Sequence, residues 1–288
     1  MKDKSLIEYV WRNSYQIVGW GKDESTQNFP TIFGGGFVLR YNDEYVFITA
    51  DHVIHLEDYE EGERMGDKCK FALVCNCNEG LTTMLLPISG FYSEDEYNFN
   101  KYINGEEELE VTLIPNLRDV AISILRSKKV MEKLYTCELQ REDEILVRKG
   151  LHKLYLTLES ITEPSSEKCY VVAGVVQNSS KGIKWEKLNA IYDNLKYAGK
   201  KMGLYKFRCE DKINITEWEG LSGSPLFDES KKVVGMILRA VPDDNLVWVL
   251  PMRNILEVIR HFVQIEKLEQ VKEILTPTAQ CQIMLHGC

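Results

Sequence analysis

Short apolar runs rich in valine and isoleucine dominate residues 15–250 and set the first expectation for the fold. Turn signals separate these runs at intervals of about 8–15 residues, which is typical of β-barrels and sandwiches rather than of alternating strand–helix units. The runs are FVLRY, YVFIT, KFALVC, LEVTLI, VAISIL, CYVVAGVV, YKFRC, KVVGMILRAV and NLVWVLP, which begin at residues 37, 45, 70, 109, 120, 169, 205, 232 and 245. The first two flank NDE, so they predict a hairpin with a three-residue loop.

Two segments break the strand pattern. Residues 185–203 (WEKLNAIYDNLKYAGKKMG) predict a short helix that a glycine ends. Residues 253–275 predict an amphipathic helix packed on the body of the protein, with an apolar face of Ile255, Ile259, Phe262, Val263 and Ile265. The acidic stretch 92–110 is expected to be an exposed loop. The expected units are therefore an N-terminal β unit (1–140), a second β unit (141–252), a C-terminal helix (253–276) and a tail (277–288).

Composition and charge narrow the class of protein. The chain has 288 residues, of which 44% are hydrophobic and 27% charged, an ordinary globular composition. Its net charge is −9 and its lysine pairs are scattered, so we expect no nucleic-acid partner. No apolar stretch approaches the roughly 18 residues of a membrane span, and we expect no membrane partner. The first residues lack the apolar core of a secretion signal, so a cytoplasmic location is expected.

The cysteines predict reduced thiols rather than a metal site. There are 8 of them at irregular spacing, in a large chain without a visible export signal. Cys69, Cys75 and Cys77 lie close together, but a zinc site needs a fourth ligand and looser spacing than Cys-x-Cys. We therefore expect these cysteines to pack, and we expect no metal and no cofactor.

Three segments carry candidate chemistry. Ser222 lies in GLSGSPLFD (220–228), where glycines let backbone N–H groups turn inward, as a nucleophile turn requires. Asp119 begins a strongly apolar strand, a costly place for a carboxylate unless it is hydrogen-bonded. His52 follows a strand in TADHVIH (49–55), and a histidine base needs an acceptor on its other ring nitrogen. Taken singly, each residue also fits an ordinary turn or surface position. His55 is interpreted as a bystander.

Together, in the chain order His, Asp, Ser, these segments resemble the chymotrypsin-fold (trypsin-like) serine proteases. The likeness is strongest to the bacterial non-zymogen branch that includes the HtrA protease domain. GGGFVLRYNDEYVFITADHV (34–53), RDVAISIL (118–125) and GLSGSPLF (220–227) carry the resemblance, which spans about residues 30–252. It implies an all-β fold of two antiparallel six-stranded barrels of the chymotrypsin type with a C-terminal α-helix. It also implies that His52 is the general base, Asp119 its orienting carboxylate and Ser222 the nucleophile.

The same resemblance implies two further groups of residues. The oxyanion donors would be the backbone N–H groups of Gly220 and Ser222. The specificity pocket and the substrate-pairing edge would comprise Thr216, Glu217, Leu238, Arg239, Ala240, Val247 and Trp248. Two interpretations of this pocket stay open: Glu217 attracts a basic side chain, or Glu217 faces solvent and Trp248 fills the pocket.

The chain departs from the family pattern at two positions beside the nucleophile. Ser224 stands where a second glycine is commonest, yet the Gly-x-Ser register selects Ser222 as the nucleophile. Leu221 stands where trypsin has an aspartate that pairs with a freshly cut N-terminus, and leucine cannot form that ion pair. IVGW (17–20) is therefore interpreted as a strand, and activity without N-terminal trimming is expected.

The sequence thus predicts a serine endopeptidase that cuts protein or peptide substrates through an acyl-enzyme. No inhibitory segment is visible, so we expect a narrow substrate range or a regulatory protein partner. The segments 185–203 and 253–275 are the candidate docking surfaces for that partner. Two alternatives stay open: a catalytically inactive trypsin-like fold used as a protein-binding module, and an unrelated β protein with chance motifs.

Overall fold

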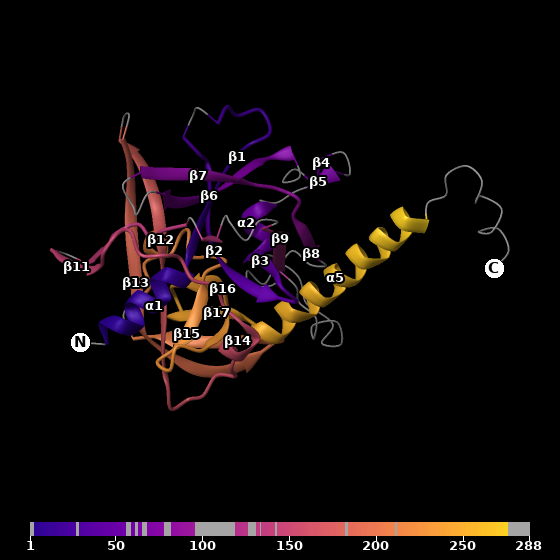
Figure 1. The fold of residues 1–288 in the computed structure, drawn as a ribbon. Coiled ribbons are helices and arrows are strands. Elements are labelled where there is room, and N and C mark those ends of the chain that lie inside the picture. Colours follow the sequence, from indigo (N-terminus) through magenta and orange to yellow (C-terminus); the bar gives the residue numbers. More distant parts are fainter. Residues whose placement is uncertain are drawn as a thin grey trace.

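The computed structural model describes residues 3–26, 29–55, 59–60, 63–64, 68–77, 82–95, 119–125, 131–132, 134–141, 143–181, 184–210 and 212–275. The expected strand at 109–114, residues 96–110 of the acidic stretch and the tail 277–288 lie outside the described residues. The described strands form two large antiparallel arrays that lie against each other (Figure 1). The all-β expectation is confirmed.

The N-terminal array is a seven-stranded sheet in the order β7-β6-β1-β2-β3-β9-β8. Its strands are β1 (Tyr15–Trp20), β2 (Ile32–Tyr41), β3 (Glu44–Thr49), β6 (Lys70–Cys77), β7 (Thr82–Ile88), β8 (Tyr92–Asp95) and β9 (Asp119–Ile124). The single-turn helix α2 (Asp51–Ile54) follows β3, and β4 (Tyr59–Glu60) pairs with β5 (Glu63–Arg64). Within the described residues this sheet has seven strands in an open order, not the six of a closed barrel. Residues 92–95, expected in a loop, form its edge strand β8.

The loop between β2 and β3 is shorter than the sequence predicts. Tyr41 pairs with Glu44, so Asn42 and Asp43 alone make the turn. Both have positive φ, 49° and 68°, as a type I′ hairpin turn requires. Asn and Asp tolerate this left-handed backbone, and the two-residue turn therefore replaces the expected three-residue loop.

The C-terminal array is a closed six-stranded barrel in the order β12-β13-β14-β17-β16-β15. Its strands are β12 (Cys169–Lys181), β13 (Lys184–Lys201), β14 (Leu204–Cys209), β15 (Pro225–Asp228), β16 (Val233–Val241) and β17 (Leu246–Pro251). In the sequence between the two arrays, the chain forms the hairpin of β10 (Leu139–Arg141) and β11 (Glu144–Val147) and the turn η4 (Leu158–Ser160). The second unit is a closed barrel of six strands, as the sequence predicts.

The helix predicted over 185–203 is wrong, because this segment is the long strand β13. It pairs with β12 on one side and β14 on the other. Gly199 has φ +104° at the register shift between Tyr197 and Lys200, and Gly203 has φ +78° in the turn before β14. Gly203, the glycine interpreted as a helix stop, therefore lies in a hairpin turn, and Gly199 lies at a bulge.

Two helices pack on these arrays. The predicted C-terminal helix is present as α5 (Met252–Leu275), and it buries Ile255 and Ile259 beside β16 and β17. A second helix, α1 (Lys4–Asn13), was not expected, although apolar residues at 6, 7, 10 and 11 mark one helical face and Asp3 caps it. Lys153 donates to carbonyls at the end of α1, those of Trp11 and Ser14. No helix within the described ranges is long and apolar enough to span a membrane.

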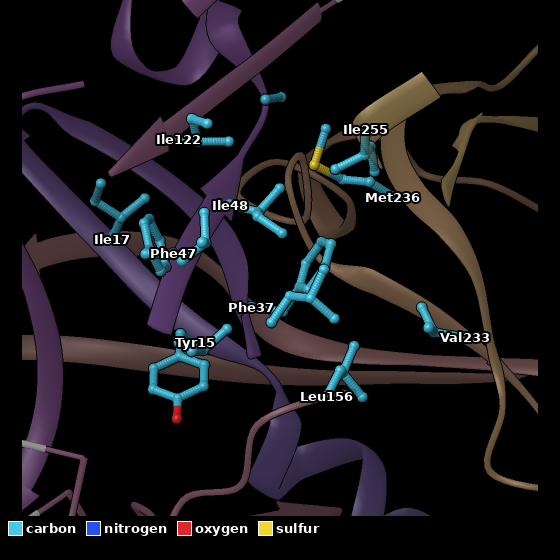
Figure 2. Close-up of a cluster of buried hydrophobic side chains, with 14 of the residues drawn as sticks. Tyr15, Ile17, Phe37, Phe47, Ile48, Ile122, Leu156, Val233, Met236 and Ile255 are labelled. Carbon is cyan, nitrogen blue, oxygen red and sulfur yellow. The ribbon is translucent and has the colours of Figure 1, made fainter. Parts of the chain in front are cut away.

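One hydrophobic core joins the sheet to the barrel. Figure 2 shows Phe37, Phe47 and Ile48 of the sheet in one cluster with Met236 of the barrel and Ile255 of α5. All five side chains are fully buried. Burial of each such side chain contributes about 1.5–3 kcal/mol. A second cluster fills the barrel itself. The shared core holds residues from both arrays in one arrangement, which matters because the candidate residues come from both.

Candidate active site

The structure brings His52 and Asp119 together at the ends of two adjacent strands. Thr49, the last residue of β3, pairs with Ala121 of β9, so α2 begins beside the start of β9 at Asp119. His52 Nδ1 lies 2.6 Å from Asp119 Oδ2, and the His52 backbone N–H donates to Oδ1 at 3.0 Å. Both oxygens of this carboxylate are therefore bound to His52. The Asp119 side chain is 6% exposed and that of His52 is 36% exposed, so the ring remains accessible from solvent.

The two groups shift each other's pKa in opposite directions. Burial lowers the pKa of His52, but the charge and hydrogen bond of Asp119 outweigh it, with help from Asp51, and the net pKa is raised. Burial raises the pKa of Asp119, but His52 and two backbone N–H groups outweigh it, and the net pKa is lowered. Asp119 therefore stays ionised, and it holds the proton of the ring on Nδ1 while Nε2 is left to accept a proton.

Ser222 lies in a tight turn between two glycines with left-handed backbone. Gly220 has φ +96° and Gly223 has φ +91°, conformations that a side chain would strain. The N–H of Leu221 donates back to Trp218, and that of Gly223 donates to Ile237 of β16.

Within the part of the chain that the structure describes, the N–H groups of Gly220 and Ser222 donate to no protein acceptor. These are the two groups that the sequence analysis names as oxyanion donors. The turn thus leaves free the pair of donors that an oxyanion requires.

Gly35 on β2 docks this turn against the N-terminal sheet. Its N–H donates to the carbonyl of Ser222 at 2.7 Å, and its carbonyl accepts from Thr49 Oγ1 at 2.7 Å. A Cβ on Gly35 would overlap Ser224, and one on Gly223 would overlap the carbonyl of Gly35. Because Thr49 ends β3 three residues before His52, the serine turn and the histidine helix are anchored at the same place. The sequence signal for this contact is the GGG run at 34–36, which the sequence analysis used only as a motif.

The hydroxyl of Ser222 is bonded to the barrel. Its Oγ donates to the backbone carbonyl of Leu238 on β16 at 2.8 Å. Among the described residues no hydrogen bond joins Ser222 to His52. The carbonyl of Leu238 as a partner of this hydroxyl is a feature that the sequence analysis missed, since no motif reports which way a serine side chain turns.

Ser224 is enclosed between the two arrays. It is fully buried, and its hydroxyl has no hydrogen-bond partner among the described residues. Its Oγ lies where side chains on Gly35 or Gly174 would need to be. A buried hydroxyl cannot reach a substrate, which agrees with the register argument that selects Ser222.

The residues expected to form the pocket fall into two groups. Thr216 and Glu217 are exposed on the turn η5 (Ile215–Glu217), and both bond to Asn214. Of the others, Leu238, Ala240 and Val247 are buried, whereas Arg239 and Trp248 are partly exposed. Arg239 pairs with Trp248 across β16 and β17, and Ala240 pairs with Val247. The second group is therefore brought together, next to Ser222, and Thr216 and Glu217 face solvent beside it.

Arg239 also acts on the site at a distance. Its charge lowers the pKa of His52, opposing the two carboxylates. Trp218, four residues before Ser222, is buried and stacks on Tyr192 with ring centroids 4.1 Å apart. Neither interaction was expected from the sequence.

Among the described residues, no group of three or more His, Cys, Asp or Glu could hold a metal ion.

Comparisons with known proteins return structures only. No family model matches the chain, and no curated protein matches it in sequence. The active form of the Rv3671c protease from M. tuberculosis matches 89% of this chain and 83% of its own, with 13% identity and a TM-score of 0.40. For a serine endoprotease from Yersinia pestis, the match covers 92% of this chain and 68% of the endoprotease, with 9% identity and a TM-score of 0.48. For Deg5, the match covers 88% of this chain and 90% of Deg5, with 12% identity and a TM-score of 0.43. The closed barrel, the curled sheet and the C-terminal helix are themselves consistent with a chymotrypsin-like fold.

Proposed function

We propose that this protein is a serine endopeptidase that hydrolyses peptide bonds in protein or peptide substrates. The observation that carries the proposal is the shared anchorage of the three residues. His52 is bonded to both oxygens of Asp119, and the Ser222 turn is bonded to Gly35, whose carbonyl is held by the strand that leads to His52. A base, its orienting carboxylate and a hydroxyl on an open turn are the groups that acyl transfer needs.

In the proposed reaction Ser222 Oγ attacks the substrate carbonyl while His52 Nε2 takes its proton. The developing negative charge on the carbonyl oxygen is received by the N–H groups of Gly220 and Ser222. Asp119 stays ionised and stabilises the imidazolium. His52 then donates the proton to the leaving amine, and water hydrolyses the acyl-enzyme by the same steps in reverse.

The substrate would lie along the edge of β16 beyond Ile237. Strand β15 covers β16 only as far as Met236, and the serine turn bonds to Ile237. After a register shift between Ile237 and Arg239, Arg239 and Ala240 pair with β17 on one side. An extended peptide adds to such an edge through main-chain hydrogen bonds. This geometry supports a protein or peptide substrate rather than a small molecule.

We further propose that the chain is active without N-terminal processing. Ile17 and Val18 are fully buried in β1, which pairs with β2 and β6 on its two sides. Leu221 is fully buried and offers no charge for a new N-terminus. Control would then come from a narrow substrate range or a regulatory protein partner. The irregular spacing of the 8 cysteines favours reduced thiols and hence a cytoplasmic location.

A second function has one observation in its favour. The Ser222 hydroxyl donates to Leu238, so the serine and histidine are not linked in this state. A trypsin-like fold that binds a peptide along β16 without cutting it would need no such link. The two functions differ in whether Ser222 changes the chemistry of the peptide or only contacts it.

Digestion of a defined peptide library separates the two. Wild type and Ser222→Ala are incubated with the same library, and new peptide termini are read by mass spectrometry. An endopeptidase produces new termini with wild type and none with Ser222→Ala. A binding module produces none with either protein, yet both retain the same peptides.

A further inference from the structure

A second buried histidine–carboxylate pair spans α2: Asp51 begins the helix, His55 caps its C-terminal end, and His52 lies between them. His55 Nδ1 is 2.7 Å from Asp51 Oδ1, and the side chains of His55 and Asp51 are 4% and 3% exposed. The backbone N–H of His55 also donates to the carbonyl of Asp51 at 2.8 Å. His55 is therefore not the bystander that the sequence predicts, because its ring is bonded to the residue that immediately precedes His52.

Asp51 connects this pair to the Asp119 carboxylate. The backbone N–H groups of Asp51 and His52 both bond to Asp119, and together they lower its pKa after burial has raised it. The side chain of Asp51 meanwhile holds His55. One residue is therefore tied by its backbone to the orienting carboxylate and by its side chain to a second buried histidine.

The helix that carries His52 needs such a tie. α2 has four residues, too few for a helix to hold itself by its own hydrogen bonds. Its ends are closed by the bonds from Val53 to Ala50 and from His55 to Asp51, and its N-cap residue, Ala50, has no side chain that can cap it. Buried charge also costs free energy unless it is paired, so His55 makes the burial of Asp51 tolerable.

We propose that Asp51 and His55 form a positioning pair, which holds the α2 turn so that the ring of His52 stays aligned with Asp119. The inference rests on the proposed function, in which His52 is the base. The pair touches no substrate and acts through His52. Asp51 also adds negative charge beside the ring, in the same sense as Asp119.

The effect of Asp51 on His52 can be measured separately from the effects of the other charges nearby. Asp119 on β9 and Asp51 on α2 raise the pKa of His52, whereas Arg239 on β16 lowers it. Strand β8, which packs against α2, brings Asp95 opposite Asp119 in the register. A change at Asp51 alone leaves the other three in place.

The test follows His52 by NMR in a Ser222→Ala background, where no chemistry is needed. For Asp51→Asn we expect the pKa of His52 to fall by roughly 0.5–1 unit, because one nearby negative charge is lost. For His55→Gln we expect the downfield Nδ1–H resonance of His52 to broaden as the ring loses alignment. Asp51→Glu keeps the charge but displaces it, so that resonance should broaden with a smaller fall in pKa.

The second readout is the rate at which a fluorophosphonate labels Ser222 in otherwise intact protein. Asp51→Asn and His55→Gln should each label roughly tenfold more slowly at the pH plateau, and the double variant no more slowly than the worse single one, since the pair acts as a unit. Asp228→Asn is the matched control, because Asp228 is a fully buried carboxylate bonded to Lys168 elsewhere. Asp228→Asn should lower the melting temperature and leave both the His52 resonances and the rate of Ser222 labelling unchanged.

The positioning role would be overturned if the His52 resonances stayed unchanged. It would also be overturned if the effects of changes at residues 51 and 55 added independently, or if they matched those of Asp228→Asn. Failure of the proposed function has a different signature. In that case wild-type Ser222 is not labelled at any pH, whereas the NMR readout of His52 remains available.

Discussion

The hydroxyl of Ser222 donates its hydrogen bond to the backbone carbonyl of Leu238, 2.8 Å away, and a hydroxyl has one proton to give. In this state the proton is directed at the proposed substrate-pairing edge and not at His52. A serine needs only a change of χ1 rotamer to turn, which takes place in picoseconds to nanoseconds at exposed sites. Under the proposed function this arrangement is a resting state, from which the hydroxyl must rotate before it can react.

A complex with a peptide inhibitor should show that rotation. A bound peptide directs main-chain N–H groups at the edge of β16, and one of them would replace the Ser222 hydroxyl on the Leu238 carbonyl. We expect a crystal structure with a peptidyl phosphonate to place Ser222 Oγ within hydrogen-bonding reach of His52 Nε2. An occupied edge with the hydroxyl still on Leu238 would favour the binding-module alternative.

The two serines of the turn should behave in opposite ways. Ser222→Ala should lower the rate of peptide hydrolysis by at least about 10³-fold, since the nucleophile is lost. Ser224→Ala should keep the rate within about threefold and leave the melting temperature unchanged or higher, because it removes a buried hydroxyl that has no partner among the described residues. Rate assays and thermal melts of both variants check this. Loss of activity in Ser224→Ala alone would mean that the register of the motif is misassigned.

The activity should depend on pH through His52. The base must be neutral to accept a proton, and the net pKa of His52 is raised because Asp119 outweighs burial. Activity should therefore be lost as pH falls, with a midpoint above the ordinary histidine value of about 6.5. Asp119→Asn should lower that midpoint and reduce the rate about 10⁴-fold, as in other triads. A wild-type acid limb centred well below pH 6 would contradict the pairing of His52 with Asp119.

Removal of the first 16 residues should harm the protein rather than activate it. The cut deletes α1, whose Leu6, Ile7, Val10 and Trp11 are buried in the main core. A chain that starts at Ile17 should melt at a lower temperature and cut peptides more slowly than the intact chain. Parallel melts and assays of the two chains decide the matter. Higher activity in the shortened chain would show that N-terminal processing activates the enzyme after all.

Gly35→Ala should disable the site more than it disables the fold. A Cβ at residue 35 meets Ser224 in the serine turn, so the turn that carries Ser222 must shift. A displacement of about 1 Å at reacting groups costs on the order of 10²-fold in rate. Gly21→Ala is the control, since its Cβ would meet only ordinary contacts at 3.5 Å. Equal rates for the two variants would show that the docking of the turn on β2 does not position Ser222.

The sequence anticipates most where a motif sits next to an apolar strand. His52 follows such a strand, Asp119 begins another, and the two are hydrogen-bonded in the structure. The strands of both arrays within the described residues also lie largely where valine-rich runs predict them. Local composition is informative here because a strand end fixes where the next side chain emerges.

The sequence fails where one residue type serves two purposes. Gly199 and Gly203 fit a helix stop as well as they fit a bulge and a turn, and only pairing with β12 and β14 decides between them. The exposure of Thr216 and Glu217 and the bond from Ser222 to Leu238 depend on side-chain directions. Such directions are set by tertiary contacts that no single segment encodes.

Active-site labelling of the intact, untreated protein shows whether Ser222 is a nucleophile. A fluorophosphonate is added at a pH above the pKa of His52, and the modified residue is mapped by peptide mass spectrometry, with Ser222→Ala and Ser224→Ala treated alongside. We expect one label on Ser222 in wild type and in Ser224→Ala, and none in Ser222→Ala. No label on wild type, or a label that survives in Ser222→Ala, would contradict it.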